Sequence, residues 1–149
     1  MSDNWLQYVP KDPTFRPTSA AAKSGEFLLS SFFPEAESVD SNFEEKVSFF
    51  HAGENWCGVQ CSTCGADAEP WWDEAMEQAS EAEFNNLQCV APCCGASVSL
   101  NGLRYLWPAA FGSYVLEAMN PNSKGLSPGQ LNQLQEVLGC ELVEIPVHL

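Results

Sequence analysis

Two short cysteine motifs constrain the fold of this chain more than any other feature. They read Cys61-Ser-Thr-Cys64-Gly65 and Cys89-Val-Ala-Pro-Cys93-Cys94-Gly95, and together they hold five of the seven cysteines. Paired cysteine knuckles, each closed by a glycine, are typical of a zinc ribbon, in which four thiolates bind one Zn²⁺ at about 2.3 Å. A site closed by four protein ligands has no open coordination position. The motifs therefore predict an ion that stabilises the fold and does not catalyse.

The second motif leaves one ligand open to choice. When it is aligned on its glycine, Ala91 stands where the first ligand is expected, and Cys94 is the third ligand. The fourth ligand is either Cys93, which requires adjacent residues to bind together, or Cys89, which requires a longer loop. We favour Cys93. The predicted ligands are Cys61, Cys64, Cys93 and Cys94, with Cys89 as the alternative fourth ligand.

The charge of the chain is strongly one-sided. Its 149 residues include 6 Lys+Arg against 20 Asp+Glu, a formal net charge of -14. No Lys or Arg lies between Val47 and Leu103, the segment that carries both cysteine motifs. Nucleic acids and anionic membranes attract proteins through Lys and Arg, so we expect neither as a partner. The charge is compatible with a basic protein partner, and equally with a charge that only keeps the protein in solution.

Neither a membrane span nor an export signal is apparent in the sequence. No window approaches the roughly 18 apolar residues of a transmembrane helix. The chain starts with Met-Ser-Asp-Asn-Trp, without a basic segment followed by an apolar run. We therefore expect a cytoplasmic protein, in which clustered cysteines are metal ligands or free thiols and not disulfides.

Apolar patterning predicts a strand, a helix and a strand in the N-terminal part. Residues 5–9 are rich in aromatic and apolar side chains and predict a short strand. A helix is predicted from Thr18 or Ser19, either of which can cap it, to the residue before Pro34. Residues 46–51 predict the second strand.

The C-terminal part repeats this order. Residues 113–119 predict a strand, and Ser127 followed by a proline predicts the start of a helix. Gly139 is expected to end this helix, and residues 141–149 alternate as in a last strand.

The combined order predicts an α+β fold with a ferredoxin-like split βαβ core. Apolar residues make up 45% of the chain, which is enough for a core of this size. We expect a single domain, residues 1–149. A zinc-ribbon-like segment, about residues 52–112, is inserted in it between the two central strands.

A predicted helix over residues 70–82, inside the insertion, carries an acidic stripe. Asp73, Glu77 and Glu81 fall at i, i+4 and i+8, where like charges repel by about 0.2–0.5 kcal/mol per pair. Such a stripe is either a solvated helix face or a site for a basic partner, whose binding would relieve the repulsion. We place the candidate partner contact at these three residues and Trp71, because tryptophan is common at interface hot spots.

Signals for catalysis are weak. The chain has two histidines, His51 and His148, and neither belongs to a zinc-protease motif; a nucleophile elbow and a phosphate-binding loop are also lacking. Cys–His catalysis would need a spatial pair such as Cys57 with His51. We expect no catalytic residues.

A further combination of short motifs is more specific than any one of them. The most specific are Pro92-Cys93-Cys94-Gly95 and Ser99-Leu100-Asn101-x-Leu103-x-Tyr105. The others are Trp5-Leu6 with Pro10 and Asp12-Pro13, Gly53-Glu54-Asn55-Trp56, Cys61-x-x-Cys64-Gly65, Trp71-Trp72 and Asn120-Pro121. Over nearly its whole length the chain thereby resembles an uncharacterised family of small bacterial proteins. The resemblance implies a bacterial origin but no activity, and the absence of Cys57 and Cys89 from the family pattern favours Cys93 as the ligand.

Three functional hypotheses follow. The first is a non-catalytic zinc-binding protein that binds a basic protein partner. It is similar in general character to immunity proteins, which neutralise a basic toxin by covering its active site. Opposite charges on the two proteins would raise the association rate and restrict the range of partners. The second is a housekeeping structural or regulatory zinc protein without a toxin partner. The third, least favoured, is a Cys/His enzyme.

Overall fold

The structure of the protein is a computed structural model that describes residues 3–51, 53 and 56–148. Parts of the expected features lie outside these residues: Ala52 at the start of the insertion, Glu54 and Asn55 of the family motif, and Leu149 at the end of the last strand. Among the described residues, no helix has the length and apolar character that crossing a membrane requires.

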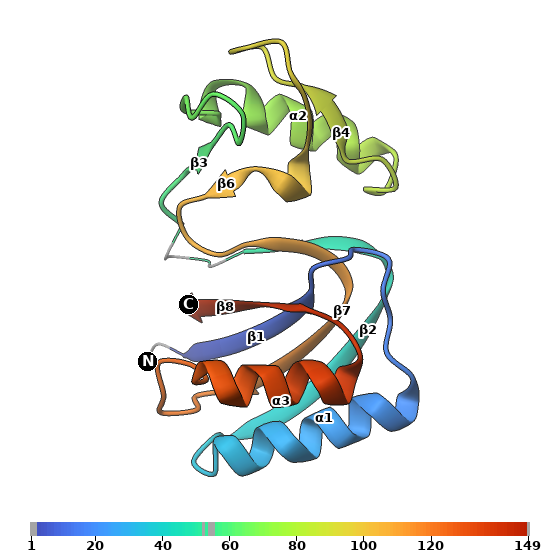
Figure 1. Ribbon diagram of the computed structural model, residues 1–149, viewed down its shortest axis with the longest axis vertical. Coiled ribbons are helices and arrows are strands. Elements are labelled where there is room, and N and C mark those ends of the chain that lie inside the picture. Colours follow the sequence, from blue (N-terminus) through green and yellow to red (C-terminus); the bar gives the residue numbers. More distant parts are fainter. Residues whose placement is uncertain (1–2, 52, 54–55, 149) are drawn as a thin grey trace.

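The protein is a mixed α+β structure built on a four-stranded antiparallel sheet (Figure 1). The strand order is β2-β7-β1-β8. The strands are β1 (Asn4–Pro10), β2 (Ser38–Phe50), β7 (Ala110–Met119) and β8 (Leu142–His148). Helices α1 (Ser19–Phe32) and α3 (Pro128–Leu138) pack on one face of the sheet. Each helix connects two strands that lie on either side of a third.

The sequence signals for both helices are confirmed. The hydroxyl of Thr18 accepts a hydrogen bond from the amide of Ala21 at 3.1 Å and so caps α1. Ser127 and Gln130 form a capping box at the start of α3, with a proline in the first turn. Gly139 ends α3 at φ +84°, a left-handed conformation that glycine adopts readily.

Strand β2 is longer than the strand predicted over residues 46–51. It begins at Ser38, and its first half is mostly polar and partly exposed, because β2 lies at the edge of the sheet. Polar side chains protect an edge strand from pairing with other chains, but they also hide the strand pattern in the sequence. The register against β7 shifts between Phe43 and Ser48. Beyond this bulge, Phe49 packs in a second core, away from α1 and α3.

Residues 56–109, between β2 and β7, form a separate unit beyond the other face of the sheet, here named the cysteine lobe (Figure 1). The helix predicted over residues 70–82 is confirmed as α2. The elements of the lobe are β3 (Val59–Gln60), α2 (Glu69–Glu81), β4 (Gln88–Val90), β5 (Ser97–Ser99), a 3₁₀ helix (Leu100–Gly102) and β6 (Arg104–Tyr105). β3 pairs with β6, and β4 pairs with β5.

An aromatic cluster joins the cysteine lobe to the sheet. The ring centroid of Phe49 lies 5.7 Å from that of Trp72, 5.8 Å from that of Tyr105 and 4.8 Å from that of Phe111. Trp56 adds an edge contact to the same ring at 6.4 Å. Aromatic pairs of this kind contribute about 0.5–1.5 kcal/mol each beyond their burial. The cluster therefore fixes the lobe on the sheet.

The core between the sheet and the helices encloses a polar pair. Tyr8 of β1 is fully buried, and its hydroxyl donates a hydrogen bond to Oε2 of Glu144 at 2.8 Å. The same oxygen accepts a hydrogen bond from the amide of Leu126 at 2.9 Å. Burial, and after it the negative charge of Glu144, raises the pKa of Tyr8 above its usual range.

We expect Tyr8→Phe to lower the free energy of unfolding at pH 7 by about 1.5–3 kcal/mol, because a hydrogen bond to a charged group is lost. The wild-type protein should also lose stability as the pH rises above about 10, where the phenol ionises in the unfolded chain but not in the folded one. Urea unfolding at neutral and alkaline pH measures both effects. An alkaline decline as steep in Tyr8→Phe as in the wild type would contradict this role.

Candidate metal centre

The first cysteine motif forms a tight hairpin tip that precedes α2. The amide of Cys61 donates to the carbonyl of Ala66 at 2.8 Å, and the amide of Gly65 donates to the carbonyl of Cys61 at 2.9 Å. Gly65 has φ +76°, a conformation that residues with a side chain rarely adopt. The glycine in the motif is therefore explained by the turn itself.

The second motif repeats this geometry with one ligand displaced. The amide of Ala91 donates to the carbonyl of Ala96 at 2.9 Å, and the amide of Gly95, at φ +74°, donates to the carbonyl of Ala91 at 2.7 Å. Ala91 thus takes the backbone position that Cys61 has in the first motif, and both are 0% exposed. The additional thiol of the second tip comes from Cys93.

The four sulfur atoms predicted as ligands come together. The Sγ atoms of Cys61, Cys64, Cys93 and Cys94 all lie within 4.8 Å of one another. The distance is 3.9 Å from Cys61 to Cys94 and 3.3 Å from Cys64 to Cys93. Around an ion with metal–sulfur bonds of about 2.3 Å, a regular tetrahedron places its sulfur atoms about 3.8 Å apart. The donor set therefore fits a tetrahedral metal ion.

Cys89, the alternative ligand, does not belong to the sulfur group that the described residues form. It lies on β4, partly buried, and packs against the core of the cysteine lobe. Burial raises the pKa of its thiol, and the nearby charge of Cys61 adds to this. Adjacent Cys93 and Cys94 are both in the group, so the longer loop is not needed.

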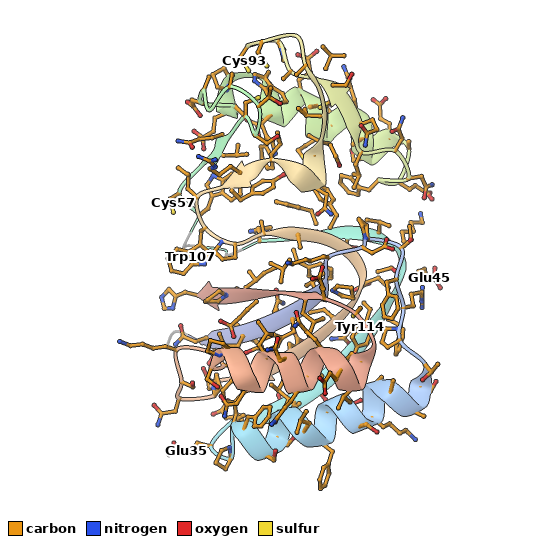
Figure 2. All side chains as sticks on the ribbon, viewed as in Figure 1. Glu35, Glu45, Cys57, Cys93, Trp107 and Tyr114 are labelled. Carbon is orange, nitrogen blue, oxygen red and sulfur yellow. The ribbon has the colours of Figure 1, made fainter. Side chains whose placement is uncertain are left out.

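The sulfur group lies at the outer end of the cysteine lobe. Figure 2 shows Cys93 at the end of the lobe that is farthest from the sheet. Cys61 is buried, whereas Cys64, Cys93 and Cys94 are exposed. An ion held there would join the two hairpin tips, and solvent would still reach one side of the group.

The thiols change one another's protonation. The backbone amides of Cys64 and Thr63 hydrogen-bond to the thiol of Cys61 and lower its pKa to about 6. The hydrogen-bond contact with Cys64 raises the pKa of Cys93 to about 12. Cys61 is therefore the thiol of the group that loses its proton most readily and the first candidate to bind a cation. A divalent cation held by these residues would favour the thiolate form of the other thiols as well.

The residues predicted to contact a partner all belong to α2. Asp73, Glu77 and Glu81 are exposed, and within the described part of the chain their carboxylates form no ion pair. Trp71 is partly buried in the core of the lobe, and its buried indole N–H has no hydrogen-bond partner among the described residues. The acidic stripe is thus a surface, whereas Trp71 serves mainly in packing.

Both histidines make contacts that support the fold. His51 stacks on Phe49 with 5.6 Å between the ring centroids, and its Nδ1 accepts a hydrogen bond from the amide of Gly53 at 3.1 Å. Nδ1 of His148 lies 2.7 Å from Oδ1 of Asn4. Cys57 is exposed and is not one of the four clustered cysteines.

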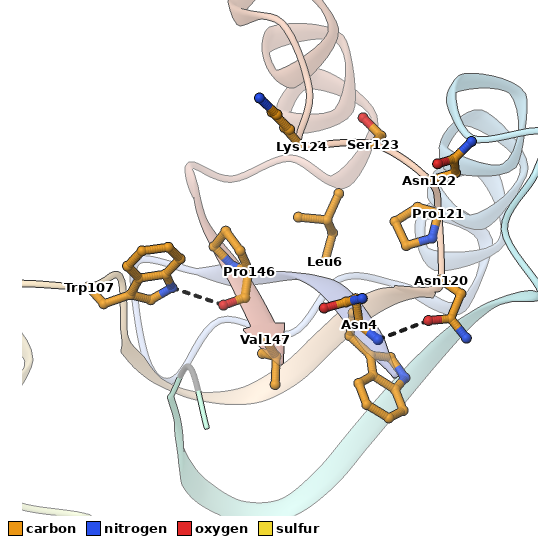
Figure 3. A pocket seen from close by; sticks show the side chains of 11 residues that line it. Asn4, Leu6, Trp107, Asn120, Pro121, Asn122, Ser123, Lys124, Pro146 and Val147 are labelled. Atoms are coloured by element: carbon orange, nitrogen blue, oxygen red, sulfur yellow. Dashed lines mark hydrogen bonds between the residues drawn. The ribbon is translucent and has the colours of Figure 1, made fainter. Parts of the chain in front are cut away.

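A cavity of about 810 Å³ lies at one end of the sheet, and no cysteine is among the described residues that line it (Figure 3). Trp107 lines it and donates its indole N–H to the carbonyl of Pro146 at 2.9 Å. The backbone amide of Asn4 donates to Oδ1 of Asn120 at 2.9 Å. Strand ends and the loop after β7 form its lining, in which these polar groups pair with one another.

Sequence reasoning missed the apolar side chains that form one buried core with Cys61. They are buried in the core of the lobe and include Val59, Ala68, Ala91 and Val98. The strands that carry some of them are only two or three residues long, too short for an alternating pattern to be visible. The one available signal was the alignment of Ala91 with Cys61.

Comparison of the chain with protein-family models, with curated proteins and with solved structures found no match.

Proposed function

We propose that the protein is a non-catalytic zinc protein in which one ion joins the two hairpin tips of the cysteine lobe. The observation that carries this proposal is the approach of four sulfur atoms from two hairpins to within 4.8 Å of one another. Thiolate ligands in a tetrahedral arrangement suit zinc or iron among the common metals, and paired knuckles that close a single site are typical of zinc. With all four positions taken by protein, the ion would stabilise the lobe.

In this proposal the fold is a ferredoxin-like split βαβ core with a zinc-ribbon-like insertion, in one domain. The strand order β2-β7-β1-β8 supports the first part, because each helix connection passes over one intervening strand. The matching backbone hydrogen bonds of the two hairpin tips support the second part. The lobe also falls between β2 and β7 in the chain.

Cobalt substitution tests the ligand set. Co²⁺ held by four thiolates gives strong sulfur-to-metal charge-transfer absorption together with the visible bands of a tetrahedral ion. We expect both signals in the reduced protein, saturating at one ion per chain and disappearing when zinc is added. Bands of an octahedral ion, or no charge transfer, would overturn the four-thiolate site.

The second part of the proposal is that the acidic face of α2 binds a basic protein. Asp73, Glu77 and Glu81 are exposed at a spacing where they repel one another. Among the described residues, Lys46 forms an ion pair with Glu83 at 2.8 Å, and none of these three carboxylates forms one. Lys and Arg of a partner would relieve the repulsion and steer the encounter. Trp71 would contribute its exposed part.

We expect Glu77→Lys combined with Glu81→Lys to abolish binding of the basic partner. The control is Glu136→Lys with Glu141→Lys, which changes the net charge equally at exposed positions in and after α3. The partner is isolated by pull-down from native lysate at low salt, and its affinity for each variant is then measured by calorimetry. Binding that is indifferent to salt and to the reversal on α2 would contradict the acidic face as the contact.

The partner class that we favour is a basic toxin, which this protein would neutralise as an immunity protein in a bacterial cytoplasm. The support is the net charge of -14 and the exposed acidic face. A toxin gene beside the gene for this chain is the expected genomic context. Without such a gene and without a retained basic partner, the chain is instead a housekeeping structural or regulatory zinc protein.

A further inference from the structure

Among the three exposed thiols of the cluster, those of Cys64 and Cys93 lie close together and come from different hairpins. The Sγ atoms of Cys64 and Cys93 are 3.3 Å apart, closer than those of Cys61 and Cys94 at 3.9 Å. Cys61, in contrast, is buried. An oxidant in solution therefore reaches Cys64 and Cys93, and each of them has the other within bonding reach after a small movement.

Hydrogen bonding also distinguishes members of the cluster. The thiol of Cys61 accepts hydrogen bonds from backbone amides, including that of Cys64, and the thiol of Cys94 accepts one from the amide of Ala96. The hydrogen-bond partners of Cys93 are the sulfur atoms of Cys64 and Cys61. An N–H donor draws electron density from a thiolate, so Cys93 as a metal-bound thiolate keeps more of its nucleophilicity.

The surrounding charge adds to this reactivity. Four thiolates around Zn²⁺ leave two negative charges on the site, and the sequence of the cysteine lobe, residues 56–109, holds one basic residue, Arg104, against many acidic ones. Electron-rich, accessible thiolates are the ones that peroxides oxidise first.

We propose that Cys64 and Cys93 are a site of reversible oxidation by peroxides, at which a disulfide forms between the two hairpins and the zinc is released. This inference rests on the proposed zinc site. It gives that site a second property, sensitivity to oxidants, that a purely structural ion does not need.

The reaction balances with hydrogen peroxide as the oxidant. The thiolate of Cys93 attacks one peroxide oxygen, the O–O bond breaks, and a sulfenic acid forms on Cys93 as hydroxide leaves. The thiolate of Cys64 then attacks this sulfur, so that the S–S bond forms, the S–O bond breaks and a second hydroxide leaves. Two protons from solvent convert both hydroxides to water. The two sulfur atoms together lose the two electrons that reduce the peroxide.

Other pairings are disfavoured by geometry. A disulfide between adjacent Cys93 and Cys94 would strain the peptide that joins them. Cys140 is partly buried and packs against the core between the sheet and the helices, and it does not belong to the core of the cysteine lobe. The Sγ atoms of Cys64 and Cys93, at 3.3 Å, are closer than those of Cys61 and Cys94, at 3.9 Å, and Cys61 is buried, so the Cys64–Cys93 bond is the expected product.

The test is a peroxide titration of the reduced, zinc-loaded protein. Zinc release is followed with a chromogenic chelator, and disulfides are mapped by mass spectrometry of proteolytic peptides. We expect one zinc ion lost for each disulfide formed, a bond that joins Cys64 to Cys93, and recovery of zinc binding after reduction. Zinc retained at doses that fully oxidise glutathione, or a disulfide between other cysteines, would overturn the proposal.

Two controls make the outcome specific. Cys57→Ser with Cys140→Ser removes two thiols outside the cluster and should leave the release of zinc unchanged. Mapping the reduced, metal-free protein separates this proposal from the proposed function. A chain that binds no zinc yet forms the Cys64–Cys93 bond refutes the zinc site and leaves the oxidisable pair; a chain that binds zinc but never forms the bond refutes the oxidisable pair alone.

Discussion

Serine at both cysteines of the first motif, Cys61→Ser with Cys64→Ser, is expected to abolish zinc binding and to unfold the cysteine lobe. A structural zinc ion supplies an apparent free energy of about 10–16 kcal/mol to small domains of this kind. The paired strands of the lobe have only two or three residues each, and such short pairs are not stable alone. The sheet with α1 and α3 has its own core, centred on Tyr8, Leu29 and Leu134, and should stay folded.

Metal analysis and tryptophan fluorescence measure this result. Trp56, Trp71 and Trp72 pack against the core of the lobe and should become exposed, which shifts their emission to longer wavelength. The matched control, Cys57→Ser with Cys140→Ser, also removes two thiols and should keep both zinc and the native emission. Retention of zinc by the double variant of the first motif would show that its sulfur atoms are not ligands.

The second large effect concerns the displaced ligand of the second motif. Loss of a residue that only contacts a metal ligand lowers metal affinity by about 10- to 100-fold. Cys93→Ser removes a ligand itself and should lower zinc affinity by more than this. Adding Ala91→Cys should restore most of the affinity, because Ala91 has the backbone position of Cys61 and the new thiol completes a regular knuckle. Ala91 and Cys61 are both 0% exposed. The extra buried sulfur atom at position 91 therefore lowers the stability by about 1–3 kcal/mol through overpacking.

Competition with a chelator of known affinity measures both steps. The control is Ala91→Ser with Cys93→Ser, which adds a side chain of similar size without a thiol and should not recover zinc binding. Equal zinc affinities of the variants with serine and with cysteine at position 91 would contradict the equivalence of the two hairpin tips. The rescued variant also lacks the exposed thiol of Cys93, so we expect it to resist peroxide.

The sequence was sufficient to predict features that a few neighbouring residues decide. The caps at Thr18 and Ser127, the glycine at position 139 and the clustering of four cysteines were all predicted and are confirmed. Each depends on a turn or a cap that a few neighbouring residues decide. Alignment of the two motifs on their glycines left Cys93 or Cys89 as the fourth ligand, and the family resemblance favoured Cys93. The sulfur atom of Cys93 belongs to the group of four in the structure.

Features decided by distant contacts were not predictable in this way. The first half of β2 looks like a polar loop in the sequence, and only its position at the sheet edge makes it a strand. Trp107 donates its indole N–H to the carbonyl of Pro146, 39 residues away in the sequence, and no local pattern indicates this contact. Phe49 joins the lobe to the sheet only because of the bulge after Phe43.

Anomalous scattering at the zinc absorption edge, from crystals of the reduced protein, tests the central claim most directly. We expect one peak per chain, about 2.3 Å from each of the four sulfur atoms of Cys61, Cys64, Cys93 and Cys94. A well-ordered lobe without a peak between these sulfur atoms, or with the thiols turned away from one another, would contradict it.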